Sequence, residues 1–318
     1  MNPSILVTGG TGFFGLALLR HWQGLGNAAP RVTILSRNPQ RFITRYPELA
    51  RSVCWQEGDI CDPMAFKKLG GFTHIIHGAT DSTLGAFVEP LLRFEQIFNG
   101  TRNALEFAAR AGVKRFLLTS SGAVYGPQPL NLKRIPEHYL AMSDPLDSNN
   151  VYGVAKLASE HLCALYARHY QIEPVVARCF AFVGPDLPFN VHFAIGNFIQ
   201  DALSGADITV LGDGTDVRSY LDQRDLAVWL TTLLDRGVAG EVYNVGSDQE
   251  ITISSLAHLI RDRLAPEKLV RVLDRESVSK QRSRYIPCIQ KARESLGLDV
   301  TVCLPDAIDF AAATHARN

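Results

Sequence analysis

Apolar residues follow two alternating patterns over the first 180 positions of the chain. Short unbroken apolar runs, such as 4–8 (SILVT) and 115–121 (RFLLTSS), are typical of strands that are buried on both faces. Longer segments, such as 91–112 and 150–170, repeat apolar residues every three or four positions, which predicts amphipathic helices. Strands that alternate with helices predict right-handed crossovers and a parallel sheet with helices on both sides. We therefore expect an α/β fold.

The pattern loosens after about residue 185. Residues 184–193 (GPDLPFNVHF) read as a loop with two prolines, and short strands at 208–214 and 242–247 then mix with helices. This change predicts two domains, a first lobe over 1–174 and a smaller lobe over 175–318. Residues 207–235 are an alternative, since this segment could fold back and complete the first lobe.

Composition narrows the classes of function. The chain has 318 residues, 46% of them hydrophobic, which is enough for a large core. Lys plus Arg and Asp plus Glu both number 32, so we expect no broad basic field for nucleic acid. We also expect a cytoplasmic protein with no leader and no membrane segment, because no apolar run approaches ~18 residues. The six cysteines are scattered without metal-ligand spacing, which predicts buried thiols and no metal site.

Three glycines separate the first predicted strand from the first predicted helix. Gly9, Gly12 and Gly15 allow a tight turn, a close backbone approach to a pyrophosphate and close packing of the helix on the sheet. The amides of the helix N-terminus, beginning at Phe13 and Phe14, would then face the phosphates. The sequence therefore predicts a dinucleotide site at this turn.

The end of the second strand bears on the choice of dinucleotide. Ser36 and Arg37 stand where an acidic residue would bind the ribose of NAD. A serine and a guanidinium suit a 2'-phosphate, so the pair favours NADP over NAD. The alternative is that Arg37 is an ordinary solvated arginine.

Two further strand ends are candidates for contact with the cofactor. Asp59, followed by Ile60, has a carboxylate that would accept from an adenine amino group, or it would cap a helix. His77, Gly78 and Ala79 end a strand where a cofactor would lie against the sheet edge. For the His77 side chain itself we expect a structural role rather than a catalytic one.

Tyr152 and Lys156 lie four residues apart on a predicted helix, so their side chains share a face. A nearby ammonium, helped by a positive nicotinamide, is expected to lower the pKa of the phenol. Tyr152 would then serve as general acid/base for an alcohol or sugar hydroxyl. Ser121, at the end of a strand, would hydrogen-bond the same oxygen.

Eight stretches spread over almost the whole chain carry a family resemblance. They are TGGTGFFG (8–15), GDICD (58–62), IIHGAT (75–80), NGTRNALEFA (99–108), TSSGAVYG (119–126), YGVAK (152–156), GDGTDVRSYLDQRDLA (212–227) and YNVGS (243–247). Together they resemble the extended short-chain dehydrogenase/reductase family, in particular its NAD-dependent epimerase/dehydratase branch acting on nucleotide sugars.

The resemblance implies a Rossmann-type doubly wound parallel sheet, a smaller C-terminal α/β lobe that binds the nucleotide sugar, and a homodimer formed through two long helices. By position it implies that Ser121, Tyr152 and Lys156 are the catalytic residues. It also implies that Arg218 grips the substrate diphosphate, although a surface salt bridge is the alternative for this residue. Val210 lies where the family packs the nucleoside.

The chain departs from the family pattern at several positions. The motif RxFNxYGP reads RCFAFVGP here, so Ala181 and Val183 replace an asparagine and a tyrosine, and Ile97 replaces an asparagine before the GT of the fourth helix. The sugar pocket is therefore expected to differ. His192 could touch a sugar, with an ordinary loop histidine as the alternative.

Gly122 and Ala123, which follow Ser121, limit the chemistry further. Relatives resembling dehydratases, decarboxylases and fucose synthases carry an acid or a cysteine here, whereas neither of these side chains moves a proton. Hydride transfer at C4 remains. We expect a reductase of NDP-4-keto-6-deoxyhexoses, with an NDP-sugar 4-epimerase holding NAD as the alternative, and a non-catalytic cofactor-sensing protein as a more remote one.

Overall fold

The computed structural model describes residues 2–80, 88–140, 142–189, 191, 193–273 and 283–315. The chain separates into two compact units. The first comprises Met1–Gly126, Leu140–Cys179 and Ala227–Tyr243, and the second comprises Pro127–Tyr139, Phe180–Leu226 and Asn244–Asn318. Assignment of the second unit to the nucleotide sugar stays a prediction.

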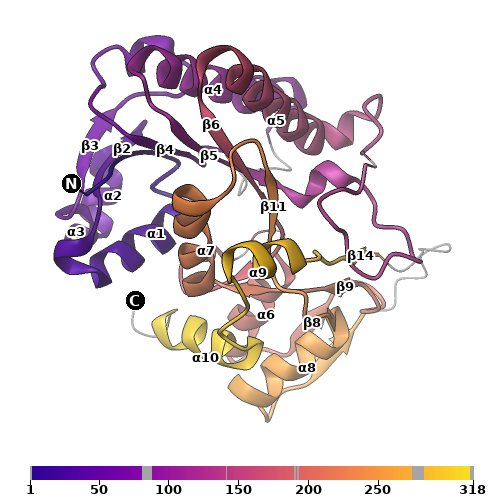
Figure 1. Ribbon diagram of the computed structural model, residues 1–318. Helices are drawn as coiled ribbons and strands as arrows, with labels where there is room; N and C mark the ends of the chain where they lie inside the picture. Colours follow the sequence, from indigo (N-terminus) through magenta and orange to yellow (C-terminus); the bar gives the residue numbers. More distant parts are fainter. Residues whose placement is uncertain are drawn as a thin grey trace. The chain divides into compact units, whose positions relative to one another are not determined.

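A seven-stranded sheet, in the order β11-β6-β5-β4-β1-β2-β3, forms the core of the first unit (Figure 1). The strand pairs from β6 to β3 are parallel. The strands β2 and β4 flank β1, so the chain winds outward in both directions from β1, and the ends of β1 and β4 mark the point where a ligand crevice is expected. The strands are β1 (Ser4–Thr8), β2 (Arg31–Ser36), β3 (Cys54–Glu57), β4 (His74–His77), β5 (Arg115–Ser121), β6 (Glu173–Cys179) and β11 (Val242–Val245).

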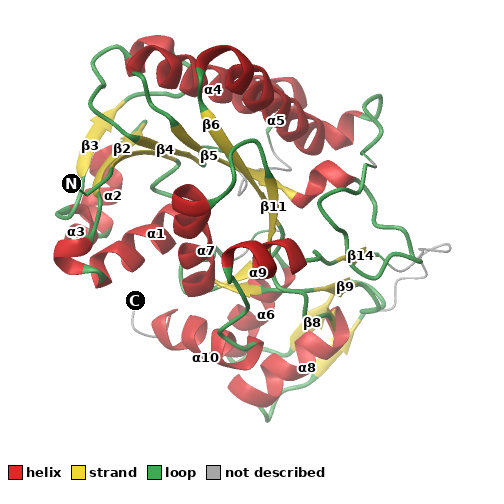
Figure 2. Cartoon of the chain, in the orientation of Figure 1, coloured by secondary structure: helices red, strands yellow, loops and turns green. Residues whose placement is uncertain are grey.

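Helices cover this sheet on both faces, as Figure 2 shows in red and yellow, so the predicted Rossmann-type α/β fold is confirmed. The helices α4 and α5 lie together on one face, and α1 lies on the other (Figure 1). The core under α4 contains Leu6, Phe66, Phe107 and Phe116, each at most 1% exposed. The helical segments that contribute to this unit are α1 (Phe13–Gly24), η1 (Gly26–Ala28), α2 (Pro39–Arg45), α3 (Pro47–Ala50), η2 (Pro63–Phe66), α4 (Pro90–Ala111), η3 (Gly122–Tyr125), η4 (Ser148–Asn150), α5 (Val151–Tyr170) and α7 (Gln223–Arg236).

The bounds of the two long helices follow from their end residues. Glu89 caps α4, because its carboxylate accepts from the amides of Leu91 and Leu92, and Gly112 ends it with a left-handed backbone. The buried face of α5 consists largely of small residues, which lets the helix approach its neighbours closely.

The second unit is built from short strands and helices. Its packing centres on α8, which contacts α6, β8 and α10. The elements are β7 (Phe182–Val183), α6 (Ala194–Leu203), β8 (Ile208–Val210), β9 (Val217–Arg218), β10 (Leu221–Asp222), β12 (Ile251–Thr252), α8 (Ile253–Leu264), β13 (Val270–Val272), β14 (Arg284–Tyr285), α9 (Gln290–Leu296) and α10 (Leu304–His315).

The structure differs from the sequence pattern at two strands. The apolar run 173–184 predicts one strand, but the structure has two, β6 and β7, which pair with different partners. Residues 242–247 were expected among the short strands of the smaller lobe, whereas β11 extends the central sheet beside β6. Apolar runs alone do not reveal either feature, because pairing partners are set by tertiary contacts.

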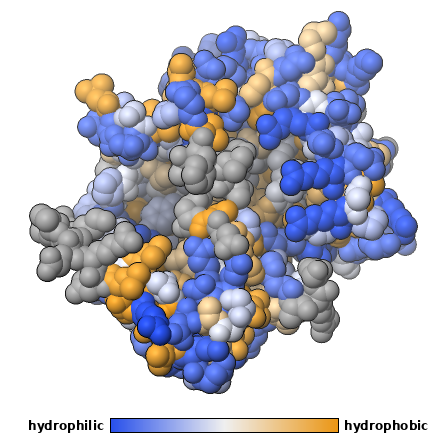
Figure 3. All heavy atoms as spheres, turned by 180° about the vertical axis from the view of Figure 1, so that it is seen from behind, coloured by the Kyte–Doolittle hydropathy of each residue, from blue (hydrophilic) through white to orange (hydrophobic). Residues whose placement is uncertain are grey.

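Hydrophilic and hydrophobic residues are interspersed on the side of the surface that Figure 3 shows. Among the residues that the structure describes, no helix is long and apolar enough to cross a membrane. Within those same residues, no group of three or more His, Cys, Asp or Glu side chains is placed to hold a metal ion.

Candidate active site

The glycine turn after β1 is shaped to receive a pyrophosphate. Gly9 has φ +75°, and a Cβ there would lie 2.5 Å from the carbonyl of Gly78, so only glycine fits between these two strand ends. A Cβ at Gly15 would lie 2.1 Å from the carbonyl oxygen of Gly10. Gly12 caps α1 without a side-chain hydrogen bond, and the first turn, which begins with Phe13 and Phe14, contains no acidic residue. An anion therefore fits this helix terminus.

Ser36 and Arg37 lie at the carboxyl end of β2, the strand next to β1. The hydroxyl of Ser36 accepts from the amide of Asn38 at 3.3 Å, and Arg37 is exposed. An exposed guanidinium beside a hydroxyl is compatible with a 2'-phosphate and with plain solvation. The preference for NADP therefore stays a prediction.

Asp59 and Ile60 form a turn after β3. The carboxylate of Asp59 accepts from the amide of Cys61 at 2.9 Å, and the carbonyl of Ile60 accepts from Asn103 at 2.9 Å. The helix cap in this stretch is Asp62, whose carboxylate accepts from the amide of Met64, so the alternative of Asp59 as a cap is wrong. Contact of Asp59 and Ile60 with an adenine stays a prediction.

His77 is held inside the first unit. Its two ring nitrogens bond the hydroxyl of Thr8 at 2.8 Å and that of Thr101 at 3.2 Å. Burial lowers the pKa of His77 to about 3, and Lys156 acts in the same direction, so the ring is neutral. Both nitrogens are therefore used by the protein, and a cofactor contact at this strand end would come from Gly78 and Ala79.

Ser121 and Tyr152 meet where the end of β5 lies against the start of α5. The hydroxyl of Ser121 accepts from the amide of Ala123 at 3.1 Å, and it is near enough to the phenol of Tyr152 to act on the pKa of that group. A Cβ at Gly153 would lie 2.6 Å from the carbonyl oxygen of Ala123, so the glycine after Tyr152 permits this close approach. A serine hydroxyl has one proton and two lone pairs, so accepting from Ala123 occupies one lone pair and leaves the proton of Ser121 to donate.

Lys156 is buried, with 3% of its surface exposed. Its ammonium donates to the hydroxyl of Thr80 at 2.8 Å and to the carbonyl of Thr119 at 2.9 Å, and lies 5.9 Å from the ring centroid of Tyr152. Burial lowers its pKa to about 8, although Cys179 and Glu160 act in the opposite direction. The structure thus brings the three predicted catalytic residues together.

The expected lowering of the Tyr152 pKa is wrong for the groups that the chain itself supplies. Burial is the largest influence and raises the pKa of Tyr152. The hydrogen bond with Ser121 and the charge of Arg93 act in the opposite direction. Spacing along a helix reveals which side chains share a face, but it does not reveal how far water is excluded from them.

The sequence analysis missed Arg93, which lies on α4. The carbon at the centre of its guanidinium group is 4.6 Å from the ring centroid of Tyr152 on α5. An arginine on an amphipathic helix usually lies on the solvated face. Only the packing of α4 against α5 brings it to the phenol.

The adjacent Ser120 belongs to a different network. Its hydroxyl donates to Glu160 at 2.5 Å, and Arg178 binds the same carboxylate at 2.6 Å while stacking on the ring of Tyr125. Because Ser120 is tied to a buried ion pair, Ser121 is the serine available to the phenol.

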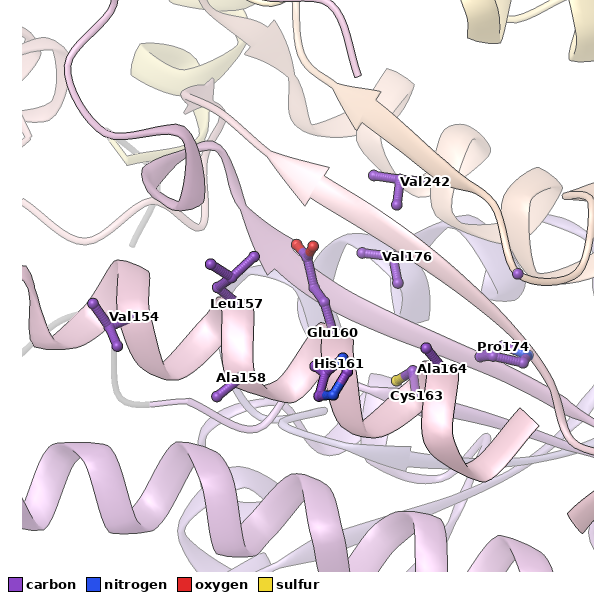
Figure 4. A pocket seen from close by; sticks show the side chains of 11 residues that line it. Val154, Leu157, Ala158, Glu160, His161, Cys163, Ala164, Pro174, Val176 and Val242 are labelled. Carbon is purple, nitrogen blue, oxygen red and sulfur yellow. The ribbon is translucent and has the colours of Figure 1, made fainter. Parts of the chain in front are cut away.

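A groove of about 590 Å³ lies between α5 and the strands β6 and β11 (Figure 4). Leu157 and Glu160 on the helix face Val176 and Val242 on the strands, and the lining is mainly apolar. Neither Tyr152 nor the other two catalytic candidates line it. The residues that do are Val154, Leu157, Ala158, Glu160, His161, Cys163, Ala164, Pro174, Val176, Gly240 and Val242.

The substrate residues predicted for the second unit have local partners. The guanidinium of Arg218 donates to the carbonyls of Val217 and Ser283 and pairs with Asp216 at 3.2 Å, and about a quarter of its side chain is exposed. Val210 is buried in β8. His192 lies outside the described residues. Substrate roles for these residues stay predictions.

Comparison with known proteins finds relatives that cover almost the whole chain and solved structures with the same fold. UDP-glucuronic acid decarboxylase 1 of Danio rerio is 29% identical over 311 residues, which cover 96% of this chain and 71% of that protein. The crystal structure of UDP-glucose 4-epimerase from Thermotoga maritima has a TM-score of 0.85 at 24% identity, with 99% of each chain covered. UDP-glucuronic acid 4-epimerase from Bacillus cereus, solved with UDP-glucuronic acid and NAD, has a TM-score of 0.81 at 23% identity, with 99% of each chain covered.

The family model for the NAD-dependent epimerase/dehydratase family matches residues 5–246. This range includes the glycine turn after β1 and the Ser121, Tyr152 and Lys156 cluster, and the seven-stranded sheet carries both. The chain therefore belongs to the NAD-dependent epimerase/dehydratase family.

Proposed function

We propose that the chain transfers hydride at C4 of a nucleoside-diphosphate sugar, using Ser121, Tyr152 and Lys156. The observation that supports this most strongly is the placement of Tyr152 beside Ser121, with the ammonium of Lys156 held by Thr119 at 5.9 Å from the centroid of the ring. A phenol, a hydroxyl and an ammonium brought together in this way suit the reversible removal of a proton from an alcohol.

The residues of the chain divide the work. The glycine turn at Gly9, Gly12 and Gly15 would hold the pyrophosphate of NAD or NADP, whose nicotinamide supplies or accepts the hydride when bound. Tyr152 gives a proton to the C4 oxygen or takes it away. Ser121 donates a hydrogen bond to that oxygen and holds its position.

The second unit would hold the nucleotide. In this proposal Arg218 binds the diphosphate and Val210 packs near the nucleoside, which agrees with the nucleotide sugars named for the relatives. We also propose a homodimer through α4 and α5, as the family resemblance implies.

Gly122 and Ala123 restrict the reaction to C4. They form the first turn after Ser121, and neither side chain can exchange a proton with a carbon next to a ketone. Dehydration and decarboxylation would therefore lack the acid or base that the family resemblance implies for this position, even though the relative from Danio rerio is named a decarboxylase.

Within this limit we propose a reductase of NDP-4-keto-6-deoxyhexoses, which Ser36 and Arg37 support through their suitability for NADPH. A 4-epimerase is the second candidate, because two solved proteins with the same fold are named 4-epimerases. An epimerase would use the same three residues and return the hydride to the opposite face of C4.

The test is to identify the nicotinamide that copurifies and then to supply 4-keto-6-deoxy sugar nucleotides with NADPH. Oxidation of NADPH in proportion to product supports the reductase. Interconversion of C4 epimers without net consumption of cofactor supports the epimerase. Tight cofactor binding with no turnover across a panel of nucleotide sugars would contradict both and favour a cofactor sensor.

A further inference from the structure

The backbone around Arg93 is fixed by the capped start of α4. The carboxylate of Glu89 accepts from the amides of Leu91 and Leu92 at 3.0 and 2.8 Å, and the amide of Arg93 donates to the carbonyl of Glu89 at 3.0 Å. Pro90 occupies the first helical position, where its fixed φ suits the helix. The side chain of Arg93 therefore extends from a helical turn whose backbone is held by these hydrogen bonds.

Among the residues that the structure describes, Arg93 and Lys156 are the cations near the ring of Tyr152, and Arg93 is the nearer one. The centre of its guanidinium is 4.6 Å from the ring centroid, whereas the ammonium of Lys156 is 5.9 Å away and donates to Thr80 and Thr119. A guanidinium stacks on an aromatic ring better than an ammonium does, because it is planar and more weakly hydrated.

The two cations also differ in chemical type, since one is an ammonium and the other a guanidinium. Burial lowers the pKa of Lys156 to about 8, while a guanidinium stays protonated throughout the range in which proteins are folded. The groups acting on Tyr152 come from four elements: Ser121 on β5, Cys179 on β6, Arg93 on α4 and Lys156 on α5 itself. Of these four groups, Arg93 is the guanidinium.

We propose that Arg93 is a positioning residue of the catalytic centre, whose guanidinium stacks on the ring of Tyr152, holds its orientation and stabilises the phenolate. The proton balance is simple: the phenol loses its proton to the C4 oxygen or regains it from there, and Arg93 itself exchanges none. The predicted effect of Arg93 on kinetics rests on the proposed function. The predicted effect of Arg93 on the ionisation of Tyr152 depends only on the contact between the two side chains.

The direct test is the ionisation of Tyr152 in the folded protein with NAD bound. Tyrosine labelled with ¹³C at Cζ gives one resonance for each of the nine tyrosines, and Tyr152→Phe identifies the relevant one. Arg93→Met removes the charge and keeps an apolar stem. We expect it to raise the pKa of Tyr152 by about one pH unit. Arg93→Lys, which keeps the charge but loses the stack, is expected to raise it by less than half as much.

Two further variants make this result interpretable. Arg51→Met removes an exposed arginine paired with Glu48 on α3, and it should leave the Tyr152 titration unchanged. Arg93→Gln replaces Arg93→Met if the latter does not fold, with the same expectation. Equal titration of Tyr152 in wild type and Arg93→Met overturns the proposal, as does a resonance that stays at the neutral position in both.

The kinetic readout separates this inference from the proposed function. For the reaction that oxidises C4, the pH profile of kcat has an acidic limb whose apparent pKa reports Tyr152. Arg93→Met should raise this apparent pKa by the same amount, with the KM for cofactor nearly unchanged. A shifted resonance without turnover of any nucleotide sugar would mean that the contact acts as inferred and the function is wrong. If turnover depends on Tyr152 but Arg93→Met does not shift the Tyr152 resonance, the proposed function stands and the inference about Arg93 is wrong.

Discussion

Lys156 in the first unit and Arg218 in the second are both predicted site cations, but their surroundings differ. Lys156 is 3% exposed, and the oxygens that hold it, from Thr80 and Thr119, are neutral. Arg218 is partly exposed and pairs with the Asp216 carboxylate two residues away. Burying an ammonium against neutral oxygens costs free energy, whereas a paired surface arginine costs little. The cost supports the proposed functional role of Lys156, while the surroundings of Arg218 would suit any surface arginine.

The largest loss of activity is expected when the phenol hydroxyl of Tyr152, in the first unit, is removed. Tyr152→Phe keeps the ring and removes the hydroxyl, so we expect kcat to fall about 1000-fold. The dissociation constant of the cofactor should change little, because only the proton transfer is lost. Steady-state kinetics and a fluorescence titration of the cofactor measure the two quantities. Retention of more than a few percent of wild-type turnover would contradict the assignment.

The cost of burying Lys156 should appear in the pH dependence of stability. Its pKa is lowered to about 8 in the folded state, so between pH 8 and its unfolded pKa the unfolded chain binds more protons and stability rises with pH. Relative to Lys156→Met, wild type should gain roughly 3 kcal/mol in the free energy of unfolding between pH 7.5 and 10.5.

Urea denaturation at several pH values measures this difference. Arg218→Met is the matched control, and its difference from wild type should not vary with pH over this range. A constant difference between wild type and Lys156→Met would mean that the buried ammonium carries no such cost.

The second region should show a smaller effect, confined to substrate binding. If Arg218 grips the diphosphate, Arg218→Ala should raise the KM for the nucleotide sugar by roughly 30-fold, equivalent to about 2 kcal/mol. The cofactor affinity and kcat should be nearly unchanged. Arg271→Ala, which breaks another arginine–aspartate pair of the same unit, is the control. An unchanged KM would leave Arg218 as a surface ion pair with Asp216.

The smallest expected effect concerns Arg37 at the end of β2. Arg37→Ala should weaken NADPH binding by about tenfold and NADH binding much less, because only NADPH carries the 2'-phosphate. Isothermal titration with both cofactors measures the ratio. Equal loss for the two would identify Arg37 as a solvated arginine without a role in specificity.

The sequence predicted local features better than tertiary ones. Apolar runs predicted β1 and β5, and the four-residue spacing placed Tyr152 and Lys156 on one face, because both depend on local geometry. The sequence could not place β11 in the central sheet, nor bring Arg93 to Tyr152, since both depend on contacts between distant segments. The sequence also could not reveal that burial raises the pKa of Tyr152, because burial is a tertiary property.

The most direct test of the central claim is to run the reaction in D₂O with unlabelled NADPH and an unlabelled 4-keto-6-deoxy sugar nucleotide. If hydride transfer is confined to C4, the product should carry protium at C3, C4 and C5. Its content of solvent deuterium should be no different from that of a control without enzyme. Deuterium introduced by the enzyme at C3 or C5 would reveal proton chemistry that Gly122 and Ala123 cannot perform. Deuterium at C4 would show that the hydrogen there does not come from the cofactor, and either result would contradict the account.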